Sequence, residues 1–177
     1  MIGIALDSMA RIRPPDRAIR WMRRFLYGMG IIAFTAVVAR PFFTLGINLD
    51  HSLPGHVFLI HKGEMPVKGQ LVAFLFQGFP PYFPQGTTFV KILAGVPGDV
   101  VRAVDEGCIK YRVNRTIIGC AKPRTHDGKV LLLGPVGEIP RGRYAVRGTH
   151  PDSLDSRYAA VGWIRRGQII GRAYRLF

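Results

Sequence analysis

An uncharged apolar run near the amino terminus constrains the fold of this chain more than any other feature. Residues 25–39 carry no charge, and the apolar character resumes after Arg40 and Pro41 and continues to Ile47. As a helix, residues 25–39 would span about 22 Å, short of a hydrocarbon core of roughly 30 Å. Snorkelling of Arg24 and Arg40 would lengthen that reach. Six arginines precede the run: Arg11, Arg13, Arg17, Arg20, Arg23 and Arg24.

Basic residues on one side of a membrane segment predict its orientation, because the more basic flank stays in the cytoplasm. We therefore expect a cytoplasmic basic segment over residues 1–24, a transmembrane anchor over residues 25–47 and an exported domain over residues 48–177. Two alternatives stay open. Val37-Val38-Ala39 is a passable cleavage site for a removable signal peptide, although Pro41 is a poor flank, and the run is also compatible with a buried helix.

The charge balance restricts the partners. The formal net charge is +14, yet 48% of the residues are apolar, which excludes a disordered basic tail. Nucleic acid and a membrane surface are the two broad partners for such a chain. From residue 41 onward there are 18 basic and 9 acidic residues. For an exported domain this excess fits anionic lipid headgroups in the bilayer, and we expect no nucleic acid.

The remainder of the chain predicts a mainly β fold, with a compact antiparallel β domain behind a single amino-terminal transmembrane helix. Apolar and β-branched runs alternate with glycine and proline. Residues 78–86 contain three prolines, which excludes a central strand there. The expected strands are Val57–His61, Leu71–Phe76, Thr87–Leu93, a hairpin over Cys108–Cys120 turning near Asn114-Arg115, Val130–Leu133, Tyr144–Val146 and Gln168–Tyr174.

Cys108 and Cys120 are the two cysteines of the chain, and they flank the predicted hairpin. A hairpin places its two ends opposite each other, and an exported domain lies in a compartment that permits disulfides. We therefore predict a bridge, with two unrelated buried thiols as the alternative.

Lys91 is a candidate general base. Strand alternation places Phe89, Lys91 and Leu93 on one face of Thr87–Leu93, and neither face suits an exposed ammonium. Burial disfavours the charged form of a lysine, and a neutral amine takes protons near neutral pH. The alternative is a lysine that reaches solvent from a sheet edge. Ser52 stands before Leu53-Pro54-Gly55, a turn that exposes a hydroxyl, and such a hydroxyl needs a base to become a nucleophile.

A third polar segment lies at residues 152–158. In an extended conformation Ser153, Asp155 and Arg157 share one face, so that Asp155 pairs with Arg157 and Ser153 bonds a nearby amine. A solvated polar loop is the alternative. We expect no metal and no cofactor, because phosphate-binding and zinc-binding spacings are missing and His51, His56 and His61 do not converge in any regular element.

These segments occur in a familiar order. Ser-Leu-Pro-Gly at 52–55, Phe-Val-Lys-Ile-Leu-Ala-Gly-Val-Pro-Gly-Asp at 89–99 and Ser-Leu-Asp-Ser-Arg-Tyr at 153–158 together resemble the boxes of type I signal peptidases, the leader peptidases with a Ser/Lys dyad. The resemblance implies Ser52 as nucleophile, Lys91 as general base, Ser153 as the group that orients the lysine, and Asp155 with Arg157 as a supporting ion pair. It also implies the β fold of a signal peptidase.

The chain departs from the family pattern in several places. Gly148-Thr149-His150 replaces the family's Gly-Asp-Asn, and Asp50 stands where a hydroxyl residue often assists the oxyanion. The chain is also short. The short length, the Ser-Leu-Pro-Gly form of the first box and the replaced Gly-Asp-Asn together resemble the TraF-type maturation peptidases of conjugative transfer, which process a pilin precursor and in some cases join its ends. The implied partner is a membrane-anchored preprotein or pilin precursor, at a bacterial inner membrane with the domain in the periplasm.

Alternatives to that function are a general type I signal peptidase and a non-enzymatic component of a transfer apparatus, the latter favoured by Asp50. A self-cleaving Ser/Lys repressor would need a DNA-binding domain that residues 1–50 do not supply. The aromatic residues Phe79, Tyr82 and Phe83 remain open: they form either a loop that enters the bilayer or a loop packed on the core.

Overall fold

The computed structural model describes residues 16–47 and 53–177. The chain forms two compact units, residues 1–40 and 41–177. In the first, helix α1 (Asp16–Ala39) is about 36 Å long at 1.5 Å per residue. It ends before Arg40-Pro41 because proline disfavours helical dihedral angles in the residue that precedes it. Its large apolar side chains are exposed, and its length and composition suffice to cross a membrane.

The predicted anchor over residues 25–47 does not coincide with this helix. The helix begins nine residues earlier, within the basic segment, and residues 43–47 form strand β1 (Phe43–Ile47). Arg17, Arg20, Arg23 and Arg24 thus belong to the first turns of α1, whereas Arg11 and Arg13 lie outside the described residues. The apolar residues beyond Pro41 belong to a sheet. The correction has a simple cause: apolar β-branched and aromatic residues suit a strand as well as a membrane span, and periodicity does not separate the two in a short run.

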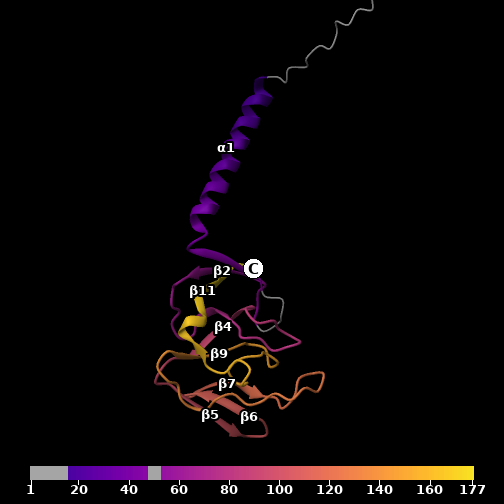
Figure 1. Cartoon of the computed structure of the whole chain (residues 1–177), viewed down its shortest axis with the longest axis vertical. Helices are drawn as coiled ribbons and strands as arrows, with labels where there is room; N and C mark the ends of the chain where they lie inside the picture. Colours follow the sequence, from indigo (N-terminus) through magenta and orange to yellow (C-terminus); the bar gives the residue numbers. More distant parts are fainter. Residues whose placement is uncertain (1–15, 48–52) are drawn as a thin grey trace, which may run out of the picture. The chain divides into compact units, whose positions relative to one another are not determined.

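The second unit is built from antiparallel strands, as the sequence predicts (Figure 1). Within the described residues, one sheet has seven strands in the order β1-β2-β11-β3-β4-β9-β10 and the other has four in the order β7-β6-β5-β8. The strands besides β1 are β2 (Val57–Lys62), β3 (Leu71–Leu75), β4 (Thr88–Gly95), β5 (Val100–Asp105), β6 (Ile109–Val113), β7 (Thr116–Ala121), β8 (Gly137–Glu138), β9 (Arg143–Arg147), β10 (Ile164–Arg165) and β11 (Ile169–Arg175).

Strand β4 organises the larger sheet. It pairs with β3 on one side and with β9 on the other, so it lies in the interior of the sheet. Phe89 and Leu93 pack into one apolar cluster, and Val90 packs into another on the opposite face. A strand with both faces covered reads as a nearly continuous apolar run, which is the pattern of this segment.

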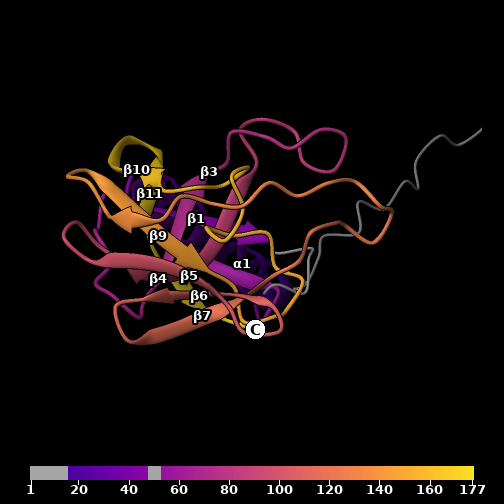
Figure 2. The ribbon, with the colours of Figure 1, turned by 90° about the horizontal axis from the view of Figure 1, so that it is seen from below.

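The smaller sheet contains the predicted hairpin (Figure 2). Strands β6 and β7 turn at Asn114, whose positive φ of 53° is a conformation that asparagine tolerates well. The predicted disulfide between Cys108 and Cys120 is present, with Cα atoms 5.9 Å apart. The bridge therefore closes the open end of the hairpin.

One strand prediction needs correction, and some of the observed strands were not predicted. The described residues Val130–Leu133 form no strand and make only isolated bridges, from Val130 to Arg124 and from Leu133 to Tyr158. Val130, Leu132 and Leu133 are exposed, because this segment lies beside a cleft and does not join a sheet. Conversely, the sequence pattern missed β5, in which Val101 alone is buried.

Candidate active site

Lys91 lies at the centre of the candidate active site. Strand β4 holds it in the interior of the seven-stranded sheet, and its side chain is only 1% exposed. The amine Nζ donates a hydrogen bond of 2.9 Å to Ser153 Oγ, and it lies 5.3 Å from the centre of the Phe89 ring. The alternative of a lysine reaching solvent from a sheet edge is therefore wrong. A lysine amine in this setting has lost most of the solvation that favours its charged form.

The segment that carries Ser153 is buried, which contradicts the alternative of a solvated loop. Asp155 and Arg157 form a two-point ion pair: Nε donates to Oδ1 at 2.8 Å and Nη2 donates to Oδ2 at 3.0 Å. The backbone N–H of Gly148 donates to the same carboxylate at 3.0 Å. Burial by itself would lower the pKa of Arg157, but hydrogen bonds and the charge of Asp155 hold that pKa above its ordinary value.

Arg157 also connects this segment to its surroundings. Its Nη2 donates to the carbonyl oxygen of Ser153 at 2.9 Å, and its Nη1 donates to the carbonyl oxygen of Cys120 at 2.6 Å. The planar guanidinium thus binds the backbone of Ser153, the carboxylate of Asp155 and the end of strand β7 at the same time. Arginine suits this position because its five donors are arranged in a rigid plane.

Ser156 is a residue of the site that sequence reasoning did not single out. Its hydroxyl is 2% exposed, accepts a hydrogen bond from the N–H of Val146 at 2.8 Å and donates one to the carbonyl of Gly162 at 2.6 Å. The segment is therefore fixed to strand β9, the neighbour of β4. The only sequence signal was the presence of a serine among apolar and charged neighbours, which is too weak to assign a role.

The predicted nucleophile Ser52 lies outside the described residues, as do Asp50 and His51. The structure does describe the residues that follow it. Residues 53–56 line a pocket of about 410 Å³ together with residues 149–151, which lead into the segment that carries Ser153. Gly55 has a φ of +105°, and a Cβ there would lie 2.8 Å from the carbonyl oxygen of Phe177. Glycine is thus required for the tight turn after Ser52.

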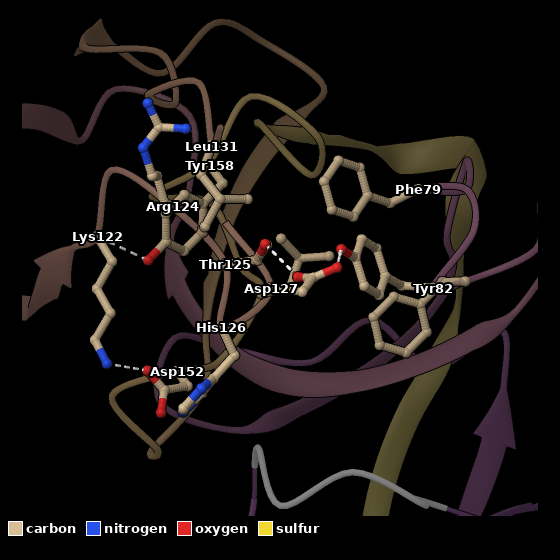
Figure 3. Close-up of a pocket in the computed structure, with 12 residues that line it drawn as sticks. Phe79, Tyr82, Lys122, Arg124, Thr125, His126, Asp127, Leu131, Asp152 and Tyr158 are labelled. Atoms are coloured by element: carbon tan, nitrogen blue, oxygen red, sulfur yellow. Dashed lines mark hydrogen bonds and ion pairs between the residues drawn. The ribbon is translucent and has the colours of Figure 1, made fainter. Parts of the chain in front are cut away.

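The predicted aromatic loop forms one side of a larger cleft of about 610 Å³ (Figure 3). Phe79 and Tyr82 face a loop that carries Thr125 and Asp127, and the Tyr82 hydroxyl bonds the Asp127 carboxylate. Phe83 packs edge-on against Phe89 of β4. Other residues of the lining are Lys122, Arg124, His126, Leu131, Asp152, Leu154 and Tyr158.

The cleft adjoins the site, because Asp152 and Leu154 flank Ser153 along the chain. Its rim is polar: Lys122 pairs with Asp152, and this ion pair holds the pKa of the Asp152 carboxyl below its usual range. The Tyr82 pKa is raised because its hydroxyl bonds the Asp127 carboxylate. Across residues 16–47 and 53–177, no group of three His, Cys, Asp or Glu side chains is placed to hold a metal ion.

Comparison with known proteins decides the family. The family model described as signal peptidase, peptidase S26, matches residues 18–177. The chain belongs to this family. Family membership makes it a serine peptidase of the class that removes leader peptides from exported precursors. With α1 long and apolar enough to span a bilayer, it also indicates a membrane-anchored enzyme.

Other comparisons add less. No curated protein matches the sequence. Among solved structures, the chain is similar to a signal peptidase I from Enterococcus faecalis V583, with a TM-score of 0.40 and 22% identity. That match covers 62% of this chain and 97% of the other.

Proposed function

We propose that this family member cleaves its substrate with Ser52 as nucleophile and Lys91 as general base. The observation that carries the proposal is the buried amine of Lys91, held by Ser153 in the interior of the sheet. Neutral Lys91 takes the Ser52 proton while Oγ attacks the scissile carbonyl. The protonated lysine then gives that proton to the leaving amine, and an acyl-enzyme remains on Ser52. Water, activated by the neutral lysine, releases the acyl group.

Supporting roles follow from the contacts. Ser153 accepts the hydrogen bond of Lys91 and so fixes the direction of the amine. Asp155 and Arg157 hold the backbone of Ser153 in place. The backbone N–H of Ser52 is the expected oxyanion donor. Asp50, an acceptor, replaces the side chain expected as the second donor, and one missing donor typically lowers the rate on the order of 10²-fold.

Processing of a co-expressed precursor tests the dyad. Ser52→Ala and Lys91→Ala should each abolish cleavage, whereas Ser8→Ala, at a serine without a proposed role, should not. Continued cleavage by either dyad variant would overturn the proposed mechanism. Loss of cleavage specifically in the Ser52 variant would also exclude a non-enzymatic transfer component, the alternative that Asp50 favours.

For the substrate we propose an exported pilin precursor of a conjugative transfer system. Support comes from the resemblance to TraF-type maturation peptidases in the Ser-Leu-Pro-Gly box, the replaced Gly-Asp-Asn and the short interval between the boxes that contain Lys91 and Ser153. An acyl-enzyme permits two outcomes, because water gives a linear product and the substrate's own amino terminus gives a ring. Intact-mass measurement separates them, since the ring is lighter than the linear product by one water.

A general type I signal peptidase is the second candidate, favoured by the family match alone. It predicts cleavage of many unrelated exported precursors. A panel of such precursors, co-expressed with the enzyme and with its Ser52→Ala variant, would distinguish this broad activity from processing confined to a pilin.

We further propose that α1 spans the bacterial inner membrane with its amino terminus in the cytoplasm and the β domain in the periplasm. The arginines of α1 and the residues before it support this orientation. The Cys108–Cys120 bridge supports an oxidising compartment for the domain. Protease added to spheroplasts should digest the β domain, and digestion only after lysis would contradict the orientation.

A further inference from the structure

The end of the β6–β7 hairpin lies against residues 152–158, the proposed catalytic segment. Three contacts join them: Nη1 of Arg157 donates to the Cys120 carbonyl at 2.6 Å, the Lys122 N–H donates to the Tyr158 hydroxyl at 3.0 Å, and the Lys122 amine pairs with Asp152. The hairpin therefore lies against the segment that carries Ser153, although about thirty residues separate the two in sequence.

Gly119 shows how tightly the hairpin approaches. Its φ is +138°, and a Cβ at this position would lie 2.6 Å from Nη1 and 3.0 Å from Cζ of Arg157. The guanidinium thus rests directly on the glycine backbone. Because a guanidinium is planar and is bonded on several sides, it has little freedom to move away from an added methyl group. The β7 backbone consequently limits where the Arg157 guanidinium can lie.

The disulfide fixes that part of β7. In the four-stranded sheet β7 is an outer strand, paired with β6 through a bulge that leaves the register shifted between Tyr111 and Arg112. Gly119 and Cys120 lie beyond this bulge, where ladder pairing alone constrains an outer strand weakly. The covalent bond from Cys120 to Cys108 ties this end of the hairpin together.

We propose that Gly119 and the Cys108–Cys120 disulfide are positioning elements that set Ser153, and through it Lys91, by way of Arg157. Each connection is short: Cys120 carbonyl to Nη1, 2.6 Å; Nη2 to Ser153 carbonyl, 2.9 Å; Ser153 Oγ to Lys91 Nζ, 2.9 Å. This inference rests on the proposed dyad. It makes full activity depend on an oxidised hairpin, so the enzyme gains full activity only after its domain reaches an oxidising compartment.

The chemistry of the switch is ordinary thiol–disulfide exchange. A dithiol such as dithiothreitol supplies two electrons and two protons, the S–S bond breaks to give two thiols, and the reagent becomes a cyclic disulfide. No bond in the catalytic segment changes. The expected effect is a displacement of the Cys120 carbonyl, and misplacement of a catalytic group by about 1 Å can lower a rate on the order of 10²-fold. A smaller shift, transmitted through two hydrogen bonds, should lower kcat about tenfold.

Steady-state kinetics of the full chain in detergent, with a purified precursor as substrate, tests the proposal. Dithiothreitol should lower kcat of the wild type about tenfold and leave KM nearly unchanged, and reoxidation should restore it. The Cys108→Ser/Cys120→Ser double variant should have the same low kcat and should not respond to the reagent. That variant is the control for effects of the reductant elsewhere. Circular dichroism at the assay temperature confirms that each sample is folded.

Gly119→Ala keeps the disulfide and displaces Arg157 directly, so this variant tests the proposal even if the reduced protein unfolds. It should lower kcat without raising KM, whereas Ile117→Ala, at an exposed position of the same strand, should match the wild type. An unchanged kcat in folded Gly119→Ala, or in the folded double serine variant, would overturn the inference. Ser52→Ala, measured beside them, keeps the two proposals distinct, because cleavage by that variant would overturn the dyad itself.

Discussion

Two loops border the same cleft, and they are held in opposite ways. In the segment that carries Ser153, residues 152–158, the side chains of Ser153, Asp155, Ser156 and Arg157 are at most 3% exposed, and each makes a described hydrogen bond. The aromatic loop, residues 78–86, contacts the facing loop through exposed groups, such as Tyr82 with Asp127. The amine of Lys129 makes a further contact with this loop, because it lies over the Phe79 ring, 4.2 Å from the ring centre.

This difference in burial suits the two loops to different roles, the buried segment to positioning a reactive group and the exposed loop to recognising a partner. A buried polar network is expensive to disturb, because each lost partner leaves a desolvated group behind. Such a network suits an amine that must hold one direction. An exposed loop with solvent-screened contacts tolerates change and adapts to what it binds. We therefore expect substitutions to affect the two loops very unequally, and the following variants measure that inequality in order of expected effect.

Lys91→Met should have the largest effect on activity. Methionine fills a similar volume, so removing a buried amine should leave the free energy of unfolding unchanged or higher. Loss of the general base should lower kcat by about 10²–10⁴-fold. Lys62→Met, at an exposed position of β2, is the matched control. A Lys91→Met enzyme with normal kcat would remove the basis for placing catalysis in the buried region.

Arg157→Ala should have the largest effect on stability. It leaves the Asp155 carboxylate buried without its cation, which typically costs about 3–5 kcal/mol. Urea denaturation at neutral pH measures the change, and Arg102→Ala on β5, at an exposed position, is the control. A loss below about 1 kcal/mol would mean that the pair behaves like a surface ion pair.

Ser156→Ala should have an intermediate effect. It removes the acceptor of the buried Val146 N–H, and an unsatisfied buried donor costs about 1–3 kcal/mol. Thr125→Ala removes a comparable hydroxyl from the exposed loop opposite the aromatic side chains, where we expect a change within about 0.5 kcal/mol. Equal losses in the two variants would abolish the distinction between the buried segment and the exposed loops on the other side of the cleft.

The aromatic loop should give the smallest change in stability, and a labelling experiment distinguishes the two alternatives for it, entry into the bilayer and packing on the core. Tyr82→Cys provides a single labelling site, because both native cysteines are in the disulfide. If the loop enters the bilayer, a fluorophore at this position in the reconstituted full chain should be quenched by spin-labelled lipid more than one at Leu132→Cys. Equal quenching would contradict membrane entry and favour the charged cleft as a site for precursor polypeptide.

Local patterns in the sequence predicted much of the candidate site. Strand alternation placed Lys91 with Phe89 and Leu93, and the hairpin brought Cys108 close enough to Cys120 for a disulfide, because both inferences use spacing within a single element. The contact between Lys91 and Ser153 joins residues 62 positions apart, and the resemblance to a family suggested it where periodicity had no means to do so.

Other features depend on tertiary packing that local patterns do not record. The residues from Phe43 to Ile47 suit a membrane span and a strand equally well. Only their pairing with β2 in the folded domain decides for a strand. Val130 to Leu133 has strand-like residues without a neighbouring strand. Nothing in the sequence around Gly119 indicates that a glycine is needed there. Only the position of Arg157 shows why a side chain would not fit.

The most direct test of the account is to isolate the acyl-enzyme. Purified enzyme mixed with precursor and quenched rapidly in acid should yield a peptide containing Ser52 whose mass is increased by that of one substrate fragment, less one water. The adduct should be missing from Ser52→Ala and should not accumulate in Lys91→Met. Cleavage that continues while Ser52 stays unmodified in that experiment, or an adduct found on another residue, would contradict the Ser52/Lys91 dyad.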